Sequence, residues 1–260
     1  MNPKSLPVLV VFNALLLALA GPAFMNKEVL AAQVKKPLLS GEFPVDLAPP
    51  PGLSAFSDVA DPRYIPGLPD KEAAAQLLAE ARWVFAGMIW GFDYVYTPSD
   101  KARGIAEFFE IKPRWTKDMA GNAISRDASV ALDIRPLSVS MQDAMLYAYL
   151  ECSLGAEEAS EQASWAFGTS HGQARGTAAY FRLNSEDPLA VMLARRKAII
   201  NAAKEALRAI LRDRTHNKPR EVRGSFAFAA VPKVIVKNGE WLSTARILTR
   251  EADIESYGAY

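Results

Sequence analysis

The sharpest chemical pattern in the chain is the run Gly168-Thr169-Ser170-His171-Gly172. It fits G-x-S-x-G, the nucleophile elbow of serine hydrolases, in which glycines permit the tight strand-to-helix turn that exposes the serine. Asp213 and His216 follow in the order that such enzymes use for the other triad members. The residues before the run are polar and do not read as the buried strand that leads into an elbow. Ser170, Asp213 and His216 are therefore hydrolase candidates, and we favour the alternative of a flexible loop.

Metal and cofactor chemistry has little support in the sequence. His171 and His216 are the two histidines, and neither belongs to H-E-x-x-H or lies beside a cysteine pair. No glycine-rich phosphate-binding motif and no EF-hand spacing occurs. The single cysteine, Cys152, cannot form an internal disulfide, and we interpret it as a small buried hydrophobe. The sequence predicts neither a metal site nor a cofactor.

Aromatic residues alternate along one short segment, at Trp90, Phe92, Tyr94 and Tyr96. A period of two is typical of a strand, here with four aromatic side chains on one face. Such a face can stack on sugars or other flat ligands, so these four residues are ligand-binding candidates. The alternative is a core face covered by the flanking helices, which we favour because large aromatic side chains contribute most when they are buried.

Helical spacing predicts three helices. The first begins at Asp70, which can cap its first turn, and ends near Gly87. A capping box starting at Thr97, with proline next and Asp100 three positions on, predicts a second helix to about Glu110. A third spans residues 187–213.

Alternating patterns predict strands at residues 130–135, 144–153, 221–236 and 241–250. The last two are joined at Asn238-Gly239, a dipeptide that favours a two-residue type I′ turn. That turn sets Ile235 opposite Leu242 and Val236 opposite Trp241. Residues 154–180 are small and polar, and we expect irregular structure or one short element there. The prediction is an α+β fold, an antiparallel sheet with helices packed on one face and a C-terminal helix followed by a β-hairpin.

The first twenty residues predict where the protein is located. Lys4 precedes an apolar run from Val8 to Ala20 that ends in Ala18-Leu19-Ala20, the pattern of a secretory signal peptide. Residues 1–20 would be removed, leaving a periplasmic or secreted protein that begins at Gly21 or Phe24 and has no transmembrane span. Residues 21–69 read as a linker or an arm, because eight of the 17 prolines fall between Pro37 and Pro69, so a single domain would span residues 70–260.

The net charge of the chain does not point to a class of partner. Thirty basic residues face 29 acidic ones, so composition indicates neither a nucleic acid partner nor an anionic membrane surface. The sequence therefore favours a non-enzymatic binding or structural role in the cell envelope, with an envelope protein or a glycan as partner. The serine hydrolase built on Ser170 is the alternative.

Three segments carry a resemblance to known proteins. The runs 81–91 and 96–103, together with 217–221 near the last hairpin, are similar to segments of uncharacterised exported bacterial proteins. The likeness extends over roughly Asp70 to Arg250. It implies export and supplies no catalytic residues, because no function is attached to that group.

Overall fold

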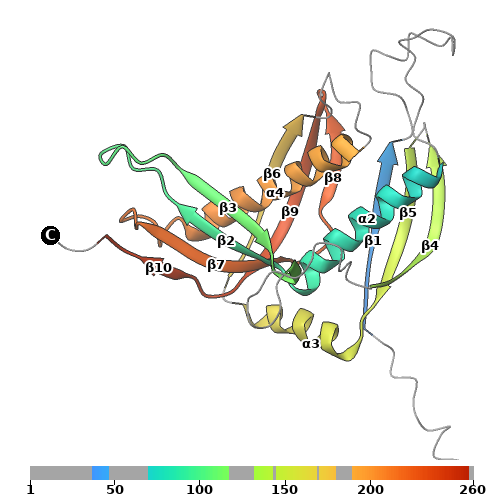
Figure 1. Cartoon of the computed structure of the whole chain (residues 1–260), viewed down its shortest axis with the longest axis horizontal. Coiled ribbons are helices and arrows are strands. Elements are labelled where there is room, and N and C mark those ends of the chain that lie inside the picture. Colours follow the sequence, from blue (N-terminus) through green and yellow to red (C-terminus); the bar gives the residue numbers. More distant parts are fainter. Residues whose placement is uncertain are drawn as a thin grey trace, which may run out of the picture. The chain divides into compact units, whose positions relative to one another are not determined.

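Two antiparallel sheets and the helices between and beside them form the fold in the computed structural model (Figure 1). The structure describes residues 37–46, 70–116, 132–142, 145–168, 170–179 and 189–257. All of them belong to one compact unit, Pro37–Tyr260. The predicted signal peptide and most of the predicted proline-rich arm lie outside the described residues.

The larger sheet has seven strands within the described part of the chain, in the order β3-β2-β7-β9-β6, with β10 beside β7 and β8 beside β9. Its strands are β2 (Phe92–Thr97), β3 (Phe108–Pro113), β6 (Ser170–Ala179), β7 (Glu221–Phe228), β8 (Lys233–Lys237), β9 (Glu240–Thr249) and β10 (Asp253–Glu255). The smaller sheet has the order β1-β5-β4, formed by β1 (Leu38–Asp46), β5 (Met145–Ser153) and β4 (Asp133–Gln142).

Two long helices supply most of the cover for these sheets. Helix α4 (Leu189–Leu211) packs along β6 and β9, and helix α2 (Asp70–Ile89) packs against β1 and β5 of the smaller sheet and β7 of the larger one. A shorter helix, α3 (Ala156–Ser164), runs into the 3₁₀ turn η2 (Trp165–Phe167), and a second turn, η1 (Arg114–Thr116), follows β3. This arrangement confirms the predicted α+β class.

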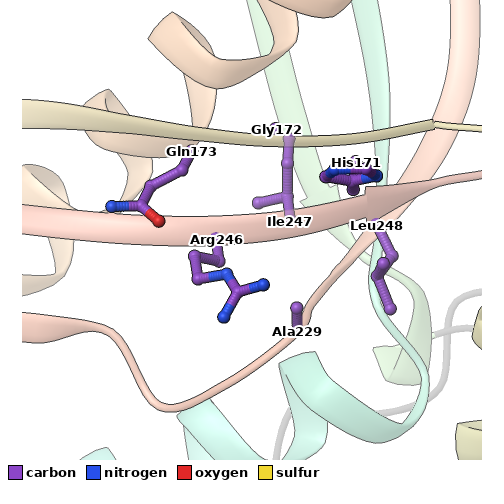
Figure 2. A pocket seen from close by; sticks show the side chains of 7 residues that line it. All are labelled: His171, Gly172, Gln173, Ala229, Arg246, Ile247 and Leu248. Atoms are coloured by element: carbon purple, nitrogen blue, oxygen red, sulfur yellow. The ribbon is translucent and has the colours of Figure 1, made fainter.

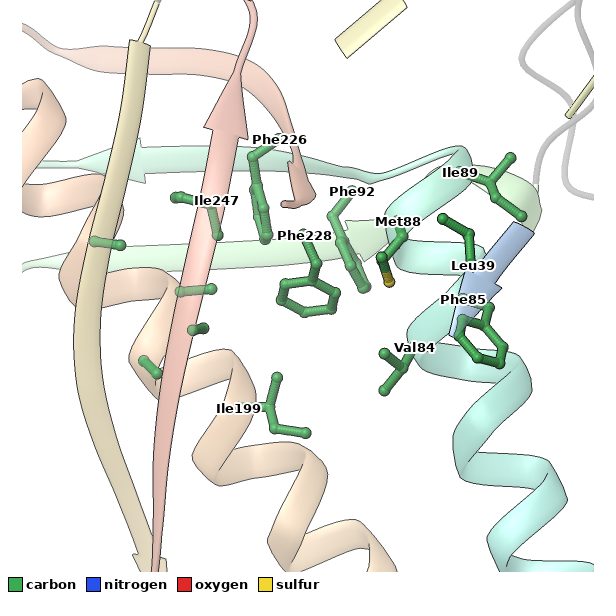
Figure 3. Close-up of a cluster of buried hydrophobic side chains, with 14 of the residues drawn as sticks. Leu39, Val84, Phe85, Met88, Ile89, Phe92, Ile199, Phe226, Phe228 and Ile247 are labelled. Atoms are coloured by element: carbon green, nitrogen blue, oxygen red, sulfur yellow. The ribbon is translucent and has the colours of Figure 1, made fainter. Parts of the chain in front are cut away.

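Side chains from both helices and both sheets meet in one core, part of which Figure 3 shows. Phe92 of β2 stacks on Phe226 of β7 with ring centroids 5.1 Å apart. Phe43 of β1 meets Phe85 of α2 edge to face at 5.4 Å. Trp83 of α2 in turn lies 5.5 Å from the Phe92 ring, so aromatic contacts join the two sheets through α2.

The contact between α4 and β6 is unusually close. A Cβ atom on Gly176 would lie 2.1 Å from the backbone nitrogen of Ala202, so only glycine fits there. The facing side of α4 is lined with alanine, at Ala198, Ala202 and Ala206, all fully buried. The Asn201 amide donates to the Thr177 carbonyl at 2.8 Å and fixes the helix along the strand.

The C-terminal hairpin has the predicted register. Ile235 lies opposite Leu242 and Val236 opposite Trp241. Asn238 and Gly239 have φ values of 54° and 75°, the left-handed pair that a type I′ turn requires.

The helix predicted after Thr97 does not form. Asp100 instead closes a tight turn with Ile105, through paired backbone hydrogen bonds of 2.9 and 2.8 Å, and strand β3 follows. The Asp100 carboxylate accepts from the Ala102 backbone at 3.0 Å and from Arg103 at 2.6 Å. A short acidic side chain that bonds its own local backbone stabilises a turn as readily as a helix cap, which is why the capping pattern was misleading.

Residues 154–180, expected to be irregular or to hold one short element, contain α3, η2 and strand β6. Its strand was missed because β6 lacks hydrophobic alternation. The residues that face α4, among them Gly172, Ala174 and Gly176, are small because the helix is so close, and those on the other face are polar as far as Thr177.

Strand β1 lies within the stretch predicted to be a linker or an arm. It pairs with all of β5, and its Phe43 is only 1% exposed. The Arg195 guanidinium of α4 donates to the Pro44 carbonyl and lies 3.1 Å from the Glu80 carboxylate of α2. Proline is tolerated in β1 because the strand is at a sheet edge, so proline content did not exclude a strand.

We expect Gly176→Ala to lower the free energy of unfolding by about 1–3 kcal/mol, because the new methyl group overlaps the α4 backbone. Gly172→Ala is the matched control. Its methyl group would mainly meet the end of the flexible Ile210 side chain at 2.9 Å, so its cost should be smaller. Chemical denaturation measures both. An equal loss in the two variants would contradict the close approach at Gly176.

Candidate functional site

The G-x-S-x-G motif lies where η2 ends and β6 begins. Ser170 is the first residue of β6, pairs with Thr249 and is partly buried. His171 follows it in the strand and therefore points to the opposite face of the sheet. Thr169 lies outside the described residues. The order of elements is thus helical turn then strand, whereas an elbow runs from strand to helix.

The other two triad candidates follow the end of α4. Asp213 and His216 are both exposed. Among the described residues, no hydrogen bond joins the Ser170 hydroxyl to either histidine. Gly172 has a packing role, because a side chain there would meet Ile210 and Ala206 of α4. A catalytic role for Ser170, Asp213 and His216 remains an untested prediction.

Three of the four aromatic candidates belong to the core. Phe92, Tyr94 and Tyr96 are 1%, 2% and 7% exposed. Trp90, just after α2, is only partly buried. Burial raises the pKa of Tyr94 to about 12, which keeps its hydroxyl neutral. The structure therefore supports the core interpretation of this face, and a ligand would reach only Trp90 without disturbing the packing.

Cys152 also lies in the core. It is completely buried in β5, and burial, reinforced by the charges of Asp133 and Glu158, raises the pKa of its thiol to about 11. A thiol must ionise to act as a nucleophile, so this environment makes Cys152 unreactive.

The described residues contain no cluster of three or more His, Cys, Asp or Glu side chains that could hold a metal ion. No helix within the described ranges is both long enough and apolar enough to cross a membrane.

An open concavity of about 500 Å³ lies over β6, β9 and the segment that follows β7 (Figure 2). It is lined by His171, Gly172, Gln173, Ala229, Arg246, Ile247 and Leu248. Gln173 pairs with Arg246 across the two strands, and His171 pairs with Leu248. The guanidinium and amide groups can donate hydrogen bonds to an oxyanion, beside an apolar contact at Leu248 and Ala229.

The concavity is one end of a larger positively charged surface. Arg175, Lys233, Lys237 and Arg246 are exposed and point away from α4, and we call them the cationic face. Their common orientation follows from the register. Lys233 and Arg175 both pair with Thr244 of β9, Lys237 pairs with Glu240, and Arg246 lies two positions beyond Thr244.

The cationic face gathers several cations on one surface with little counter-charge. None of its four cations forms an ion pair with another described residue, and Glu240 is the one carboxylate in the paired residues of β6, β8 and β9 that share this face. Several arginines elsewhere are paired, as in Arg208 with Glu107 at 2.7 Å and Arg250 with Glu161 at 3.0 Å.

Sequence reasoning missed the cationic face, although one part of it could have been predicted. The predicted hairpin register already sets Lys233 opposite Thr244. Arg175 could not be added, because the pairing of β6 with β9 joins segments about seventy residues apart that no local pattern connects.

The chain belongs to a family of uncharacterised bacterial proteins, whose model matches residues 31–257. An uncharacterized protein of Treponema pallidum (strain Nichols) is 25% identical over 185 residues, which cover 68% of this chain and 68% of that protein. No solved structure matches the chain. The family membership confirms the resemblance drawn from the sequence, and export remains a prediction.

Cys152 should make the stability of the protein depend on pH in the alkaline range. Its pKa rises from 9.0 to about 11 on folding, so the neutral thiol favours the folded state below pH 9. Above pH 9 the unfolded thiol ionises first, and the free energy of unfolding should fall as the pH approaches 11. Denaturation of wild type and Cys152→Ala tests this. A fall equally steep in the variant would contradict the assignment.

Proposed function

We propose that this is an exported protein of the cell envelope with a non-enzymatic binding role, and that its partner binds at the cationic face. The observation that carries the proposal is the concentration of four exposed, unpaired cations on one side of the larger sheet, within the described residues. The whole chain has a formal net charge of only +1, so the charge is unevenly distributed.

An uneven charge distribution has a direct consequence for binding. Cations that neighbour carboxylates cancel at a distance, whereas cations on one face without counter-charge add their fields and attract anions. Exposed arginine and lysine side chains also retain their hydrogen-bond donors for a ligand. The proposed partner is therefore anionic.

Two observations support a role without catalysis. Ser170 and His171 point to opposite faces of the same sheet, and the hydroxyl has no hydrogen bond to a histidine in the described structure. The Cys152 thiol is buried and protonated. Labelling by a fluorophosphonate probe that is abolished in Ser170→Ala would contradict the non-enzymatic role.

Export is supported by the residues before the described part of the chain. Lys4, the apolar run from Val8 and the end Ala18-Leu19-Ala20 together have the order of a signal peptide. N-terminal sequencing of protein from the envelope fraction should find Gly21 or Phe24 first. Recovery of Met1 on protein from the envelope fraction would contradict cleavage of a signal peptide. Absence of the protein from the envelope fraction would contradict export.

The cationic face should retain the protein on an anionic matrix despite the small net charge. On phosphocellulose at neutral pH, Arg175→Glu/Lys233→Glu/Arg246→Glu should elute at roughly half the salt concentration of wild type, because a local cluster is what the matrix binds. Arg82→Glu/Lys197→Glu/Arg212→Glu, on the exposed sides of α2 and α4 and just beyond α4, changes the net charge equally. This control variant should elute at a salt concentration closer to that of wild type. Identical elution of the two variants would contradict the proposal.

A further inference from the structure

We infer that the cationic face binds the surface of an anionic phospholipid bilayer, an inference that rests on the binding role proposed above. The inference depends on three properties of this face: the spacing of its cations, an exposed apolar side chain among them, and its breadth.

The spacing follows from strand geometry. Lys233, Thr244 and Arg175 form one row across β8, β9 and β6, and Arg246 belongs to the next row on β9. Neighbouring strands are about 4.8 Å apart, and side chains on one face recur every ~6.8 Å along a strand. The three cations therefore form a triangle whose sides are roughly 7–10 Å, with the Thr244 hydroxyl between them. That spacing suits separate headgroup phosphates better than one small anion held by all three.

An apolar residue lies within the charged surface. Ile235 is 56% exposed and lies between Lys233 and Lys237 on the same face of β8. A polyanion would gain nothing from this side chain. At a bilayer, an isoleucine flanked by lysines can enter the headgroup boundary while the ammonium groups contact phosphates.

The breadth of the face favours a surface over a pocket ligand. The four cations belong to three adjacent strands, and the concavity adjoins only Arg246 at one end. Anionic membranes attract such clusters because each nearby arginine or lysine adds to the attraction within a Debye length.

Sedimentation with vesicles tests the inference. The probes are phosphatidylcholine vesicles and vesicles that contain about 30% phosphatidylglycerol, a composition with a strongly negative surface. The protein without residues 1–20 should sediment with the anionic vesicles only, and binding should weaken as sodium chloride rises from about 50 to about 300 mM.

Two pairs of variants separate charge from apolar contact. Arg175→Glu/Lys233→Glu/Arg246→Glu should lower the vesicle partition coefficient roughly tenfold or more, whereas Arg82→Glu/Lys197→Glu/Arg212→Glu should lower it far less. Ile235→Ser should lower it several-fold, and Leu193→Ser, which changes a similarly exposed residue of α4, should not. Retained thermal unfolding transitions show that the variants are folded.

The outcomes distinguish this inference from the proposal on which it rests. Equal sedimentation with both vesicle types overturns the bilayer as partner. So does binding to anionic vesicles that is unchanged in Ile235→Ser and is abolished by dextran sulfate. Retention on phosphocellulose without vesicle binding also overturns the bilayer and leaves the anion-binding role intact. Loss of both overturns both.

Discussion

The close approach of helix α4 to strand β6 is the constraint on which the arrangement of the larger sheet depends. Gly176 meets the backbone of Ala202 without an intervening side chain, and the facing alanines of α4 allow the helix to lie flat along β6. With one face of β6 and β9 sealed in this way, alternation directs Gln173, Arg175 and their partners on β9 to the open face. The packing on one side thus determines which residues are offered to a partner on the other.

A second constraint joins the smaller sheet to this core. The Glu80 and Arg195 side chains are both buried between α2 and α4, and Arg195 also donates to the Pro44 carbonyl of β1. Burial raises the pKa of Glu80, and the Arg195 charge opposes that rise. Two buried charges are expensive to desolvate, so removing one partner would leave the other uncompensated. The pair therefore favours one position for β1.

Charge in this protein has two distinct uses. Arg250, just after β9, lies 3.9 Å over the buried Trp165 ring and pairs with Glu161, which fixes η2 against the sheet. Such paired cations contribute to structure and carry little field into solvent. The cations on β6, β8 and β9 have no such partners among the described residues and leave their field exposed. The net charge of the chain counts paired and unpaired cations alike, so it does not reveal the uneven distribution of charge.

Local sequence patterns specify the elements whose stability is local: α2 and α4 through helical spacing, β5 through alternation, and the hairpin register through Asn238-Gly239. The remaining features depend on contacts between distant segments. Tertiary contacts make the capping pattern at Asp100 a tight turn, place β1 in a proline-rich stretch, and make β6 a strand whose Gly172 and Gly176 pack against α4. The cationic face depends on both local pattern and tertiary pairing. The hairpin register is local, whereas the β6–β9 pairing joins distant segments, and only that pairing brings Arg175 beside Lys233.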